Sequence, residues 1–342
     1  MDNDLQHLIS TDKSQADQML PNFLELAEIQ SRLQRIDGYI NEFMASNQGK
    51  PEILYEAAYH LIKAGGKRLR SLIAVLACEA VGGEIEDVLP VALAAELLQT
   101  ASLIHDDLID DDETRRGVPT VHSIFGRKTA LLAGDLLISQ AIRLLGDYGE
   151  PDLLSHIGVG GTKMCEGEAA DLYLSPERPE DYTLEEYLEI TQRKTVSFIE
   201  AAVAIGVRIG GGDEVKTKAL KDYAKGMGVA FQIRDDILDV QSHEHTVGKT
   251  TKSDLRLGRP NYVILSALRY SDEETGQKLF KALVDEDIHK VLQIVDETAV
   301  VALAKEDAKQ HITKAKRALR EVKILKKHLL NRMADYVIHR NV

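Results

Sequence analysis

The stretch SLIHDDLIDDDETRRG, residues 102–117, is the part of the chain from which fold and chemistry are best predicted. Asp106, Asp107 and Asp110 stand at i, i+1 and i+4, so a helix would stack Asp106 and Asp110 with Asp107 beside them. Like charges at i and i+4 destabilise a helix by roughly 0.2–0.5 kcal/mol unless a cation neutralises them. The preceding run ALAAELLQTASLI is largely apolar, which places these carboxylates near the interior of a helical bundle.

The same spacing recurs in FQIRDDILD, residues 231–239, where Asp235, Asp236 and Asp239 follow the apolar run GMGVAFQI. A solvated acidic face would explain one such cluster, but two that both follow apolar segments need another explanation. Residues 106–117 lack the glycine that a calcium-binding EF-hand loop needs at its sixth position, and no Glu-x-x-His pairs of a ferritin-like site occur in the right context. Paired carboxylates favour Mg²⁺ that keeps waters and bridges to a substrate diphosphate.

The apolar periodicity of the chain predicts an all-α fold. Apolar residues repeat at three and four, as in Leu54, Ala57, Leu61 and Ile62. Breaks rich in Gly, Pro, Asp and Asn divide the chain into roughly ten or eleven helices, and none of them has the length of a flexible linker. We therefore predict one single-domain bundle over residues 49–342. Residues 1–48 form an acidic helical extension, which we expect to be an edge helix or a partner surface.

Composition excludes several classes of protein. The 342 residues contain 55 acidic and 42 basic side chains, a net charge of −13, which would repel nucleic acid. The two cysteines, Cys78 and Cys165, give neither a disulfide framework nor a metal spacing, so a cytoplasmic location is expected. The first thirty residues are too polar for a signal peptide. No apolar run reaches about 20 residues, which predicts no transmembrane segment.

Basic residues gather at a few places in this acidic chain. They are AGGKRLRS (64–71), TRRG (114–117), QRKTV (192–196) and VGKTTKSDLRLGRP (247–260). Solvated helix ends would explain them singly, but Arg115 and Arg116 directly follow the first acidic cluster. Arginine can hold a phosphate through two parallel hydrogen bonds, whereas lysine supplies a point charge. The sequence therefore predicts two anion sites, one held mostly through Mg²⁺ and one mostly through Lys and Arg.

The order of these motifs resembles that of the trans-isoprenyl diphosphate synthases, the polyprenyl synthetase family. The matches run from about residue 50 to the end of the chain: GGKRLR, the two aspartate motifs, PTVHSIFG (119–126), Gly134–Asp135, Lys194–Thr195 and Gly248–Lys249. The resemblance implies a helical bundle around a central cavity, with the aspartate motifs on opposite walls of its mouth. It also implies a prenyltransferase that joins isopentenyl diphosphate to an allylic diphosphate primer, with three Mg²⁺ per active site.

The resemblance assigns a role to each motif residue of this chain. Asp106, Asp110 and Asp235 would bind Mg²⁺, and Asp107, Asp236 and Asp239 would orient the metal shells through water. The extending diphosphate would be held by Lys67, Arg70 and Arg116, and the allylic diphosphate by Arg115, Lys194 and Lys249. Thr195 and Gln232 would direct oxygen dipoles at the allylic carbon. Gln99 replaces the usual histidine and could donate to a diphosphate, and Arg259 keeps a charge in a segment, Arg259–Pro260–Asn261, that departs from the family pattern.

Small residues on the helix before the first aspartate bear on product length. Ser102 lies one turn below Asp106, with Ala101 beside it, and Ala95 lies three turns below, a depth of about 16 Å. Short-chain members of the family commonly carry an aromatic residue at position 101 or 102. We therefore expect an open tunnel and a long-chain product of the heptaprenyl to decaprenyl range, for quinone side chains such as that of menaquinone. Within the family, the chain resembles the long-chain type, such as the catalytic component of heptaprenyl diphosphate synthase.

Other functions are left open at this point. The enzyme could make a shorter farnesyl or geranylgeranyl product, or be one subunit of a heteromeric synthase that is inactive alone. A terpene cyclase would not need GGKRLR or a second DDxxD motif, and a helical scaffold would leave six interior carboxylates unexplained. The resemblance also implies a homodimer or a heterodimer with a small unlike subunit. Contact with a membrane would then be transient, for product release.

Overall fold

The computed structural model describes residues 22–173, 183–241 and 261–340, and it confirms the all-α prediction. The described residues are 82% helical and form 14 helices when the continuous run α9–η3–α10 counts as one. The expected number was ten or eleven. The difference arises partly because Asp272 and Asp287 cap new helices through their side chains, which divides the C-terminal part into short segments.

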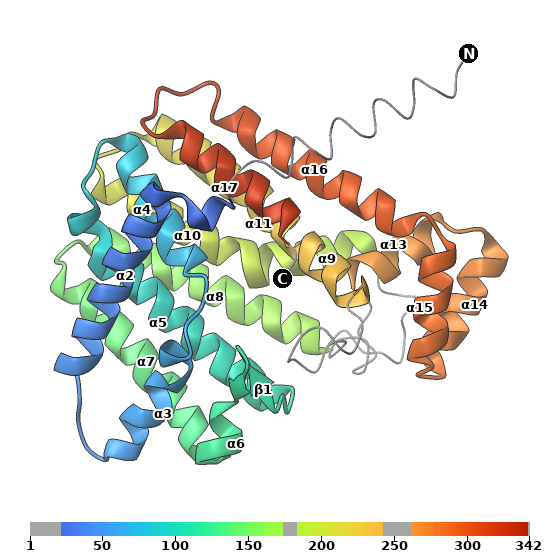
Figure 1. Cartoon of the computed structure of the whole chain (residues 1–342), viewed down its shortest axis with the longest axis horizontal. Coiled ribbons are helices and arrows are strands. Elements are labelled where there is room, and N and C mark those ends of the chain that lie inside the picture. Colours follow the sequence, from blue (N-terminus) through green and yellow to red (C-terminus); the bar gives the residue numbers. More distant parts are fainter. Residues whose placement is uncertain (1–21, 174–182, 242–260, 341–342) are drawn as a thin grey trace.

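The elements follow one another along the chain as Figure 1 shows. They are η1 (Phe23–Glu25), α2 (Ala27–Ser46), α3 (Glu52–Lys63), α4 (Leu69–Val81), α5 (Ile85–Ile109), β1 (Thr114–Arg115), β2 (Val118–Pro119), α6 (Val121–Phe125), α7 (Arg127–Asp147) and α8 (Pro151–Tyr173). After these come α9 (Leu184–Thr191), the π-helical turn η3 (Gln192–Val196), α10 (Ser197–Ile209), α11 (Glu214–Gln241), α13 (Tyr262–Tyr270), α14 (Glu273–Val284), α15 (Ile288–Glu297), α16 (Val300–Ala318) and α17 (Lys327–His339).

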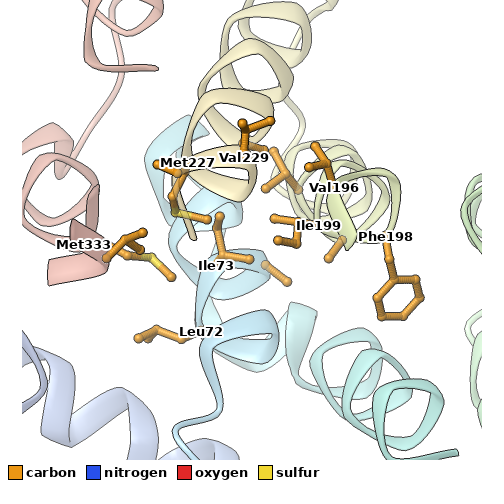
Figure 2. Packing of buried hydrophobic residues seen from close by; sticks show 14 of the residues in the cluster. Leu72, Ile73, Val196, Phe198, Ile199, Met227, Val229 and Met333 are labelled. Atoms are coloured by element: carbon orange, nitrogen blue, oxygen red, sulfur yellow. The ribbon is translucent and has the colours of Figure 1, made fainter. Parts of the chain in front are cut away.

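The core is built where the long helices cross. Helix α5 packs against α4 and α7, and α11 packs against α10 and α16. Figure 2 shows Ile73 of α4, Ile199 of α10, Met227 of α11 and Met333 of α17 meeting in one apolar cluster. The crossing of α4 and α10 depends on Gly206, because a Cβ added there would stand 2.3 Å from the Ala74 carbonyl oxygen.

The helix directions give the bundle two distinct ends. One end holds the beginning of α4, the end of α5, the π turn η3 and the end of α11, and all the predicted site residues that the structure describes lie there or nearby. The other end holds the end of α4 and the end of α10, where Gly83 and Gly210 are in close contact. The turn between α16 and α17 closes this second end, since the Leu325 amide donates to the Ala80 carbonyl at 2.7 Å.

Helix α2 packs against the body of the bundle. Ile29, Ile36 and Ile40 are fully buried against the body of the protein. The Arg32 guanidinium donates to Glu79 of α4, with Nε–Oε2 at 2.6 Å and both side chains about nine-tenths buried. The boundary at residue 48 stays a prediction, and residues 1–21 lie outside the described residues.

Two helices, α5 and α7, are long and apolar enough to cross a membrane by length and composition. The sequence predicted no such segment. Both helices pack against each other within the bundle, and two-thirds of the apolar window of α5 is buried there. Burial in the core explains why α5 is apolar. It explains the apolar character of α7 only in part, because the outer face of α7 is exposed.

Candidate active site

The first aspartate cluster occupies the last turn of α5. Asp106 is partly buried, and burial followed by the nearby Glu168 raises the pKa of its carboxyl to about 7, while Lys194 and Arg115 act to lower it. Asp110 ends the helix, and its amide donates to the Asp106 carbonyl at 2.9 Å. Nearby cations such as Lys194 and Arg115 therefore do not fully offset the negative charge of this cluster.

Asp107 faces away from Asp106, toward the small β hairpin. Only 1% of it is exposed, and its Oδ1 accepts from Nε of Arg115 at 2.6 Å. Arg115 also donates to Asp112 at 2.8 Å. Asp107 and Asp112 therefore hold the guanidinium of Arg115 in place. Since Arg115 is predicted to bind the allylic diphosphate, Asp107 orients a side chain that would contact substrate.

Lys194 is held on the wall next to Asp106 by carboxylates that the sequence analysis did not identify. Its Nζ lies 2.8 Å from Glu168 and 2.7 Å from Asp171, one turn apart on α8. Burial acts to lower the pKa of Lys194, but Asp171 and Glu168 raise it above its ordinary value, so the ammonium stays charged. Helix α8 approaches closely because Gly167 has no side chain: a Cβ there would stand 2.4 Å from the Lys194 amide.

The backbone at Lys194 and Thr195 is a π-helical turn inserted between α9 and α10. Such turns are rare and are often found at functional sites. The Thr195 hydroxyl donates to Oε1 of Gln232 at 3.3 Å, and the Gln232 amide donates to Asp236 at 3.0 Å. The two oxygen dipoles predicted to act together are thus joined in one hydrogen-bonded chain.

Asp236 anchors that chain and is 4% exposed. Besides Gln232, its carboxylate accepts hydrogen bonds from the Tyr187 hydroxyl of α9 and, at 2.8 Å, from the Tyr262 amide at the start of α13. The shell-orienting role predicted for Asp236 and Asp239 is not tested by these contacts. They do show that Asp236 fixes the position of Gln232 and ties three helices together.

Asp235 faces the C-terminal end of the described chain. It forms an ion pair with Arg340, whose guanidinium also lies 3.8 Å above the ring of Phe231. Arg234 donates to the Arg340 carbonyl at 2.7 Å, which holds this residue in place. A tertiary contact across 105 residues therefore supplies the cation for Asp235.

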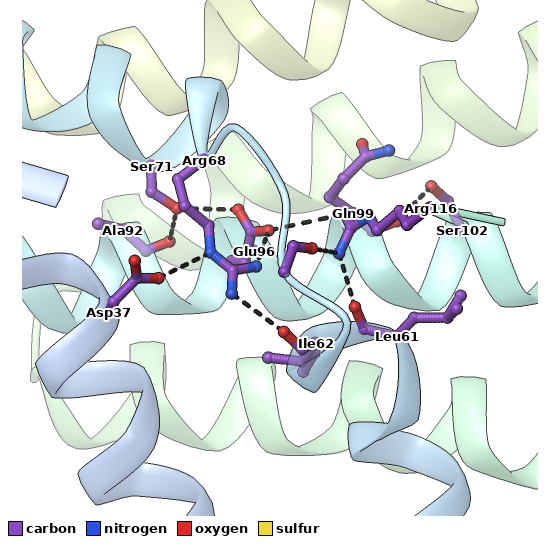
Figure 3. A network of polar contacts seen from close by, with 11 residues as sticks. Asp37, Leu61, Ile62, Arg68, Ser71, Ala92, Glu96, Gln99, Ser102 and Arg116 are labelled. Atoms are coloured by element: carbon purple, nitrogen blue, oxygen red, sulfur yellow. Dashed lines mark hydrogen bonds and ion pairs between the residues drawn. The ribbon is translucent and has the colours of Figure 1, made fainter. Parts of the chain in front are cut away.

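A buried glutamate on α5, Glu96, organises the basic side of the site, as Figure 3 shows. It is 3% exposed and accepts from Arg68 at 2.8 Å and from Ser71 at 3.1 Å, while Nη2 of Arg116 lies 3.8 Å away. Arg68 and Arg116 both adopt left-handed backbone conformations, with φ of 50° and 55°. Non-glycine residues are uncommon in this region and cluster at ligand sites, where surrounding contacts hold them.

Arg116 shapes the loop that carries GGKRLR. Its Nη1 donates to the carbonyls of Leu61 at 2.8 Å and Gly65 at 2.5 Å. Gly66 has a φ of +150°, and a Cβ there would lie 3.1 Å from the Arg116 guanidinium carbon. The two glycines are therefore needed so that the loop can close around this arginine.

Arg70 connects the two aspartate clusters. Burial lowers the pKa of its guanidinium to about 10, while Glu96, Asp235 and Asp106 act to raise it, so it remains charged at neutral pH. Asp106 and Asp235 thus both act on the charge of this one arginine, and their placement on opposite walls of the site stays a prediction. Within the described part of the chain, the buried Nε of Arg70 has no hydrogen-bond partner, so its N–H could donate to a ligand.

The remaining predicted residues lie on the margins of the described site. Lys67 is exposed beside Arg68, and the Ser102 hydroxyl donates to the Gln99 carbonyl at 3.0 Å. Ala101 and Ala95 have no exposed surface, whereas Ser102, Gln99 and Leu98 keep some. Lys249 and Arg259 lie outside the described residues. Asn261 has a clear local role, because its side chain accepts from the Val263 and Ile264 amides and caps α13.

The donors at this site fit a hard divalent cation. They are carboxylate oxygens, one of which has a raised pKa, and the described Oε1 of Glu168 is buried without a hydrogen-bond partner. Across the three described ranges, no group of three His, Cys, Asp or Glu side chains forms a ready-made metal cage. Magnesium that keeps waters and bridges to substrate oxygens does not need such a cage.

Comparison with known sequences agrees with this geometry. The family model for polyprenyl synthetase matches residues 51–298. A short chain isoprenyl diphosphate synthase of Methanothermobacter thermautotrophicus is 38% identical, covering 85% of this chain and 91% of the relative. A geranylgeranyl diphosphate synthase of Methanosarcina mazei is 36% identical over 92% and 97%. A geranylfarnesyl diphosphate synthase of Aeropyrum pernix is 35% identical over 89% and 99%.

Solved structures agree as well. A geranylgeranyl pyrophosphate synthetase from Pyrococcus horikoshii superposes with a TM-score of 0.82 at 36% identity, covering 92% of this chain and 98% of that one. A polyprenyl synthase from Caulobacter crescentus, complexed with calcium and isoprenyl diphosphate, gives 0.84 at 29% identity over 94% and 98%. A decaprenyl diphosphate synthase from Rhodobacter capsulatus gives 0.83 at 27% over 94% and 100%.

The chain belongs to the polyprenyl synthetase family. It is a trans-prenyl diphosphate synthase and therefore a prenyltransferase. The family uses a divalent metal, and membership of it implies that the substrates are isopentenyl diphosphate and an allylic diphosphate. The heptaprenyl resemblance predicted from the sequence is not supported at that level of detail, because the relatives described above at 35–38% identity carry names of short-chain or medium-chain enzymes.

Several residues that hold the site together were missed from the sequence: Arg68, Glu96, Glu168, Asp171, Tyr187 and Arg340. Glu96 could have been found, because it is the only charged residue in the apolar run 88–104 and a buried glutamate needs a partner. Arg340 lies far from the motifs, and only the packing of α17 against α11 brings it to Asp235.

Replacing Glu96 with glutamine should destabilise the protein strongly. The substitution keeps the side-chain shape but leaves Arg68 and Arg116 without the buried charge they face, and breaking a buried ion pair typically costs about 3–5 kcal/mol. Urea denaturation measures the change in unfolding free energy. Glu86→Gln is the matched control, because its pair with Arg35 is more than half exposed and should contribute less than about 1 kcal/mol. Equal effects in the two variants would contradict the role of Glu96.

Proposed function

We propose that this enzyme extends an allylic diphosphate with isopentenyl diphosphate to a product of four or five isoprene units, geranylgeranyl or geranylfarnesyl diphosphate. The names of the relatives support this length. The structure supports it as well, because residues 91–97 of α5 are fully buried and Leu98 is the deepest partly exposed residue below Asp106 on this face. That depth is about 12 Å, less than the 16 Å expected when Ala95 was taken to line the tunnel.

We assign the allylic diphosphate to the wall formed by Asp106, Asp110 and Lys194, with Arg115 beside it. Mg²⁺, with three ions expected, would be held by Asp106, Asp110 and Asp235 and would stabilise the departing pyrophosphate. Glu168 and Asp171 hold the Lys194 ammonium toward that leaving group, and Asp107 holds Arg115. Lys249, which lies outside the described residues, is assigned to the same diphosphate as a further cation.

The extending diphosphate is assigned to the basic wall. Arg70 offers a partly buried guanidinium on which both aspartate clusters act; Lys67 lies on the same glycine loop, and Arg116 donates to that loop at Gly65. Gln99 lies on the same side. Thr195 and Gln232, held by Asp236, would direct oxygen dipoles at the allylic carbon as it becomes positive, and partly buried apolar side chains such as Leu98 would exclude water from the cation.

Asp106→Ala and Asp235→Ala should each lower the turnover of isopentenyl and allylic diphosphates by roughly a thousandfold or more. Each variant removes a carboxylate from one of the two facing walls. Pyrophosphate release in Mg²⁺ measures the rate, and circular dichroism checks the fold. Asp111→Ala is the control, because Asp111 is exposed and pairs only with exposed Arg127 in the described structure. Near-normal turnover of either wall variant would overturn the proposed site.

Ser102→Phe should shorten the product by one or more isoprene units while the first condensation continues. A ring at this position would fill the open space below Asp106, since Ser102 keeps exposed surface. Chromatography of the products made by the purified chain measures their length. Ala101→Phe should instead lower stability by about 1–3 kcal/mol, because Ala101 is fully buried and a ring there would overpack the core. A wild-type product of seven or more units would contradict the short-chain proposal.

We further propose that two copies of the chain associate through α7 and the adjoining part of α8. Leu131, Leu132 and Ile142 of α7 and Val159 of α8 are each at least 50% exposed. Large apolar side chains gathered on neighbouring helices usually mark an interface. A homodimer would bury these four side chains between two copies of the chain, so no unlike subunit is needed to cover them.

Leu132→Glu combined with Ile142→Glu should convert a dimer into a monomer, because the charges would be buried in the interface. Sedimentation velocity at micromolar concentration measures the mass. Val215→Glu, on an exposed position of α11, serves as the control and should leave the dimer intact. A wild-type monomer would exclude the homodimer and favour the alternative of a small unlike subunit.

A further inference from the structure

The segment that joins α16 to α17 is the most basic part of an acidic protein. Residues 314–327 contain seven Lys or Arg side chains and one carboxylate, Glu321, a net charge of +6. The whole chain carries −13, so the rest carries −19. The prediction from composition, that the protein repels polyanions, therefore does not hold at this segment.

Four of the seven cations form what we call the basic ridge: Lys314, Arg317, Arg320 and Lys323. All four are exposed, and within the residues that the structure describes no carboxylate lies within ion-pairing distance of any of them. By contrast, Lys316 pairs with Asp335, and Lys326 lies 2.7 Å from Glu79. Lys314 and Arg317 stand one turn apart on α16, and Arg320 and Lys323 continue the line into the turn.

A large apolar side chain projects beside the ridge. Leu325 is 59% exposed, although its backbone amide is fixed to the Ala80 carbonyl at 2.7 Å. The next residue, Lys326, has a φ of 50° and is tied to buried Glu79. The backbone of the turn is therefore anchored on α4 while the Leu325 side chain faces outward.

The ridge lies at the end of the bundle opposite the aspartates. Helix α5 begins at that end with Ile85 and carries Asp106 near its other end, 21 residues further on, which corresponds to about 32 Å. In Figure 1 the turn between α16 and α17 projects at the edge of the molecule, away from α14 and α15. A surface that binds the ridge would therefore leave the mouth of the site accessible to substrates from water.

We propose that the basic ridge and Leu325 dock this end of the protein onto an anionic lipid membrane. Lysines and arginines near an anionic leaflet each strengthen binding by about fivefold, and an exposed leucine can enter the boundary between headgroups and acyl chains. The remaining charge of −19 is repelled by the same surface, so contact is restricted to this end. The proposal rests on charge and exposure and holds whatever length of product the enzyme makes.

Co-sedimentation with vesicles tests this proposal. Vesicles of phosphatidylcholine alone are compared with vesicles that contain about one-third phosphatidylglycerol, at about 0.1 M and 0.5 M salt. The full-length protein should bind only the anionic vesicles and should be released at high salt. Arg320→Glu with Lys323→Glu should weaken binding at least about tenfold. Leu325→Ala should weaken it about fivefold without a change of charge.

Lys278→Glu with Lys281→Glu is the matched control, because it makes the same change of net charge on exposed positions of α14. This control should bind as the wild type does, and all variants should keep the wild-type turnover with soluble substrates. Equal binding to neutral vesicles, or equal losses in ridge and control variants, would overturn the proposal. Binding of a short DNA duplex as tightly as anionic vesicles at equal phosphate concentration would also overturn it, because the ridge would then be a general polyanion site.

Discussion

Carboxylates buried on α5 must be neutralised by cations from other parts of the chain, and the architecture of the site depends on this constraint. Glu96 draws Arg68 and Arg116 together, and Asp107 holds Arg115. Because an isolated buried charge costs several kcal/mol, these pairs fix the glycine loop and the β hairpin against α5. Asp106 forms no such ion pair within the described residues, and burial and Glu168 raise its pKa to about 7, so a bound cation would stabilise its charged form.

On the wall that carries Thr195 and Gln232, the structure holds neutral dipoles in place rather than pairing charges. Thr195 lies in a π turn, Gln232 on α11, and neither would keep its orientation without a fixed partner. Asp236 provides it, and its further bonds to Tyr187 and the Tyr262 amide bring α9 and α13 to the same point. Rigid dipoles of this kind need not reorient when a carbocation forms nearby. Preorganised sites accelerate reactions because they avoid this cost.

The two ends of the bundle differ in charge as well as in shape. Acidic clusters and paired arginines line the end where α5 finishes, and unpaired cations gather where α16 meets α17. Between them, the seven fully buried residues 91–97 of α5 limit how deep an open space can extend below Asp106. A protein polarised in this way can hold water-soluble diphosphates at one end and face a different surface with the other.

The sequence by itself determined the helical fold, the family and the two aspartate clusters, because helical periodicity and i, i+4 carboxylates depend on local spacing. It also predicted which basic segments would face these clusters. The partners of each charge were decided only by tertiary structure: Arg340 reaches Asp235 across 105 residues, and Glu168 and Asp171 meet Lys194 because Gly167 lets α8 approach. The depth of open space below Asp106 likewise depends on tertiary structure. Whether Ala101 and Ala95 face open space or a packed helix depends on neighbouring helices, and small side chains suit both.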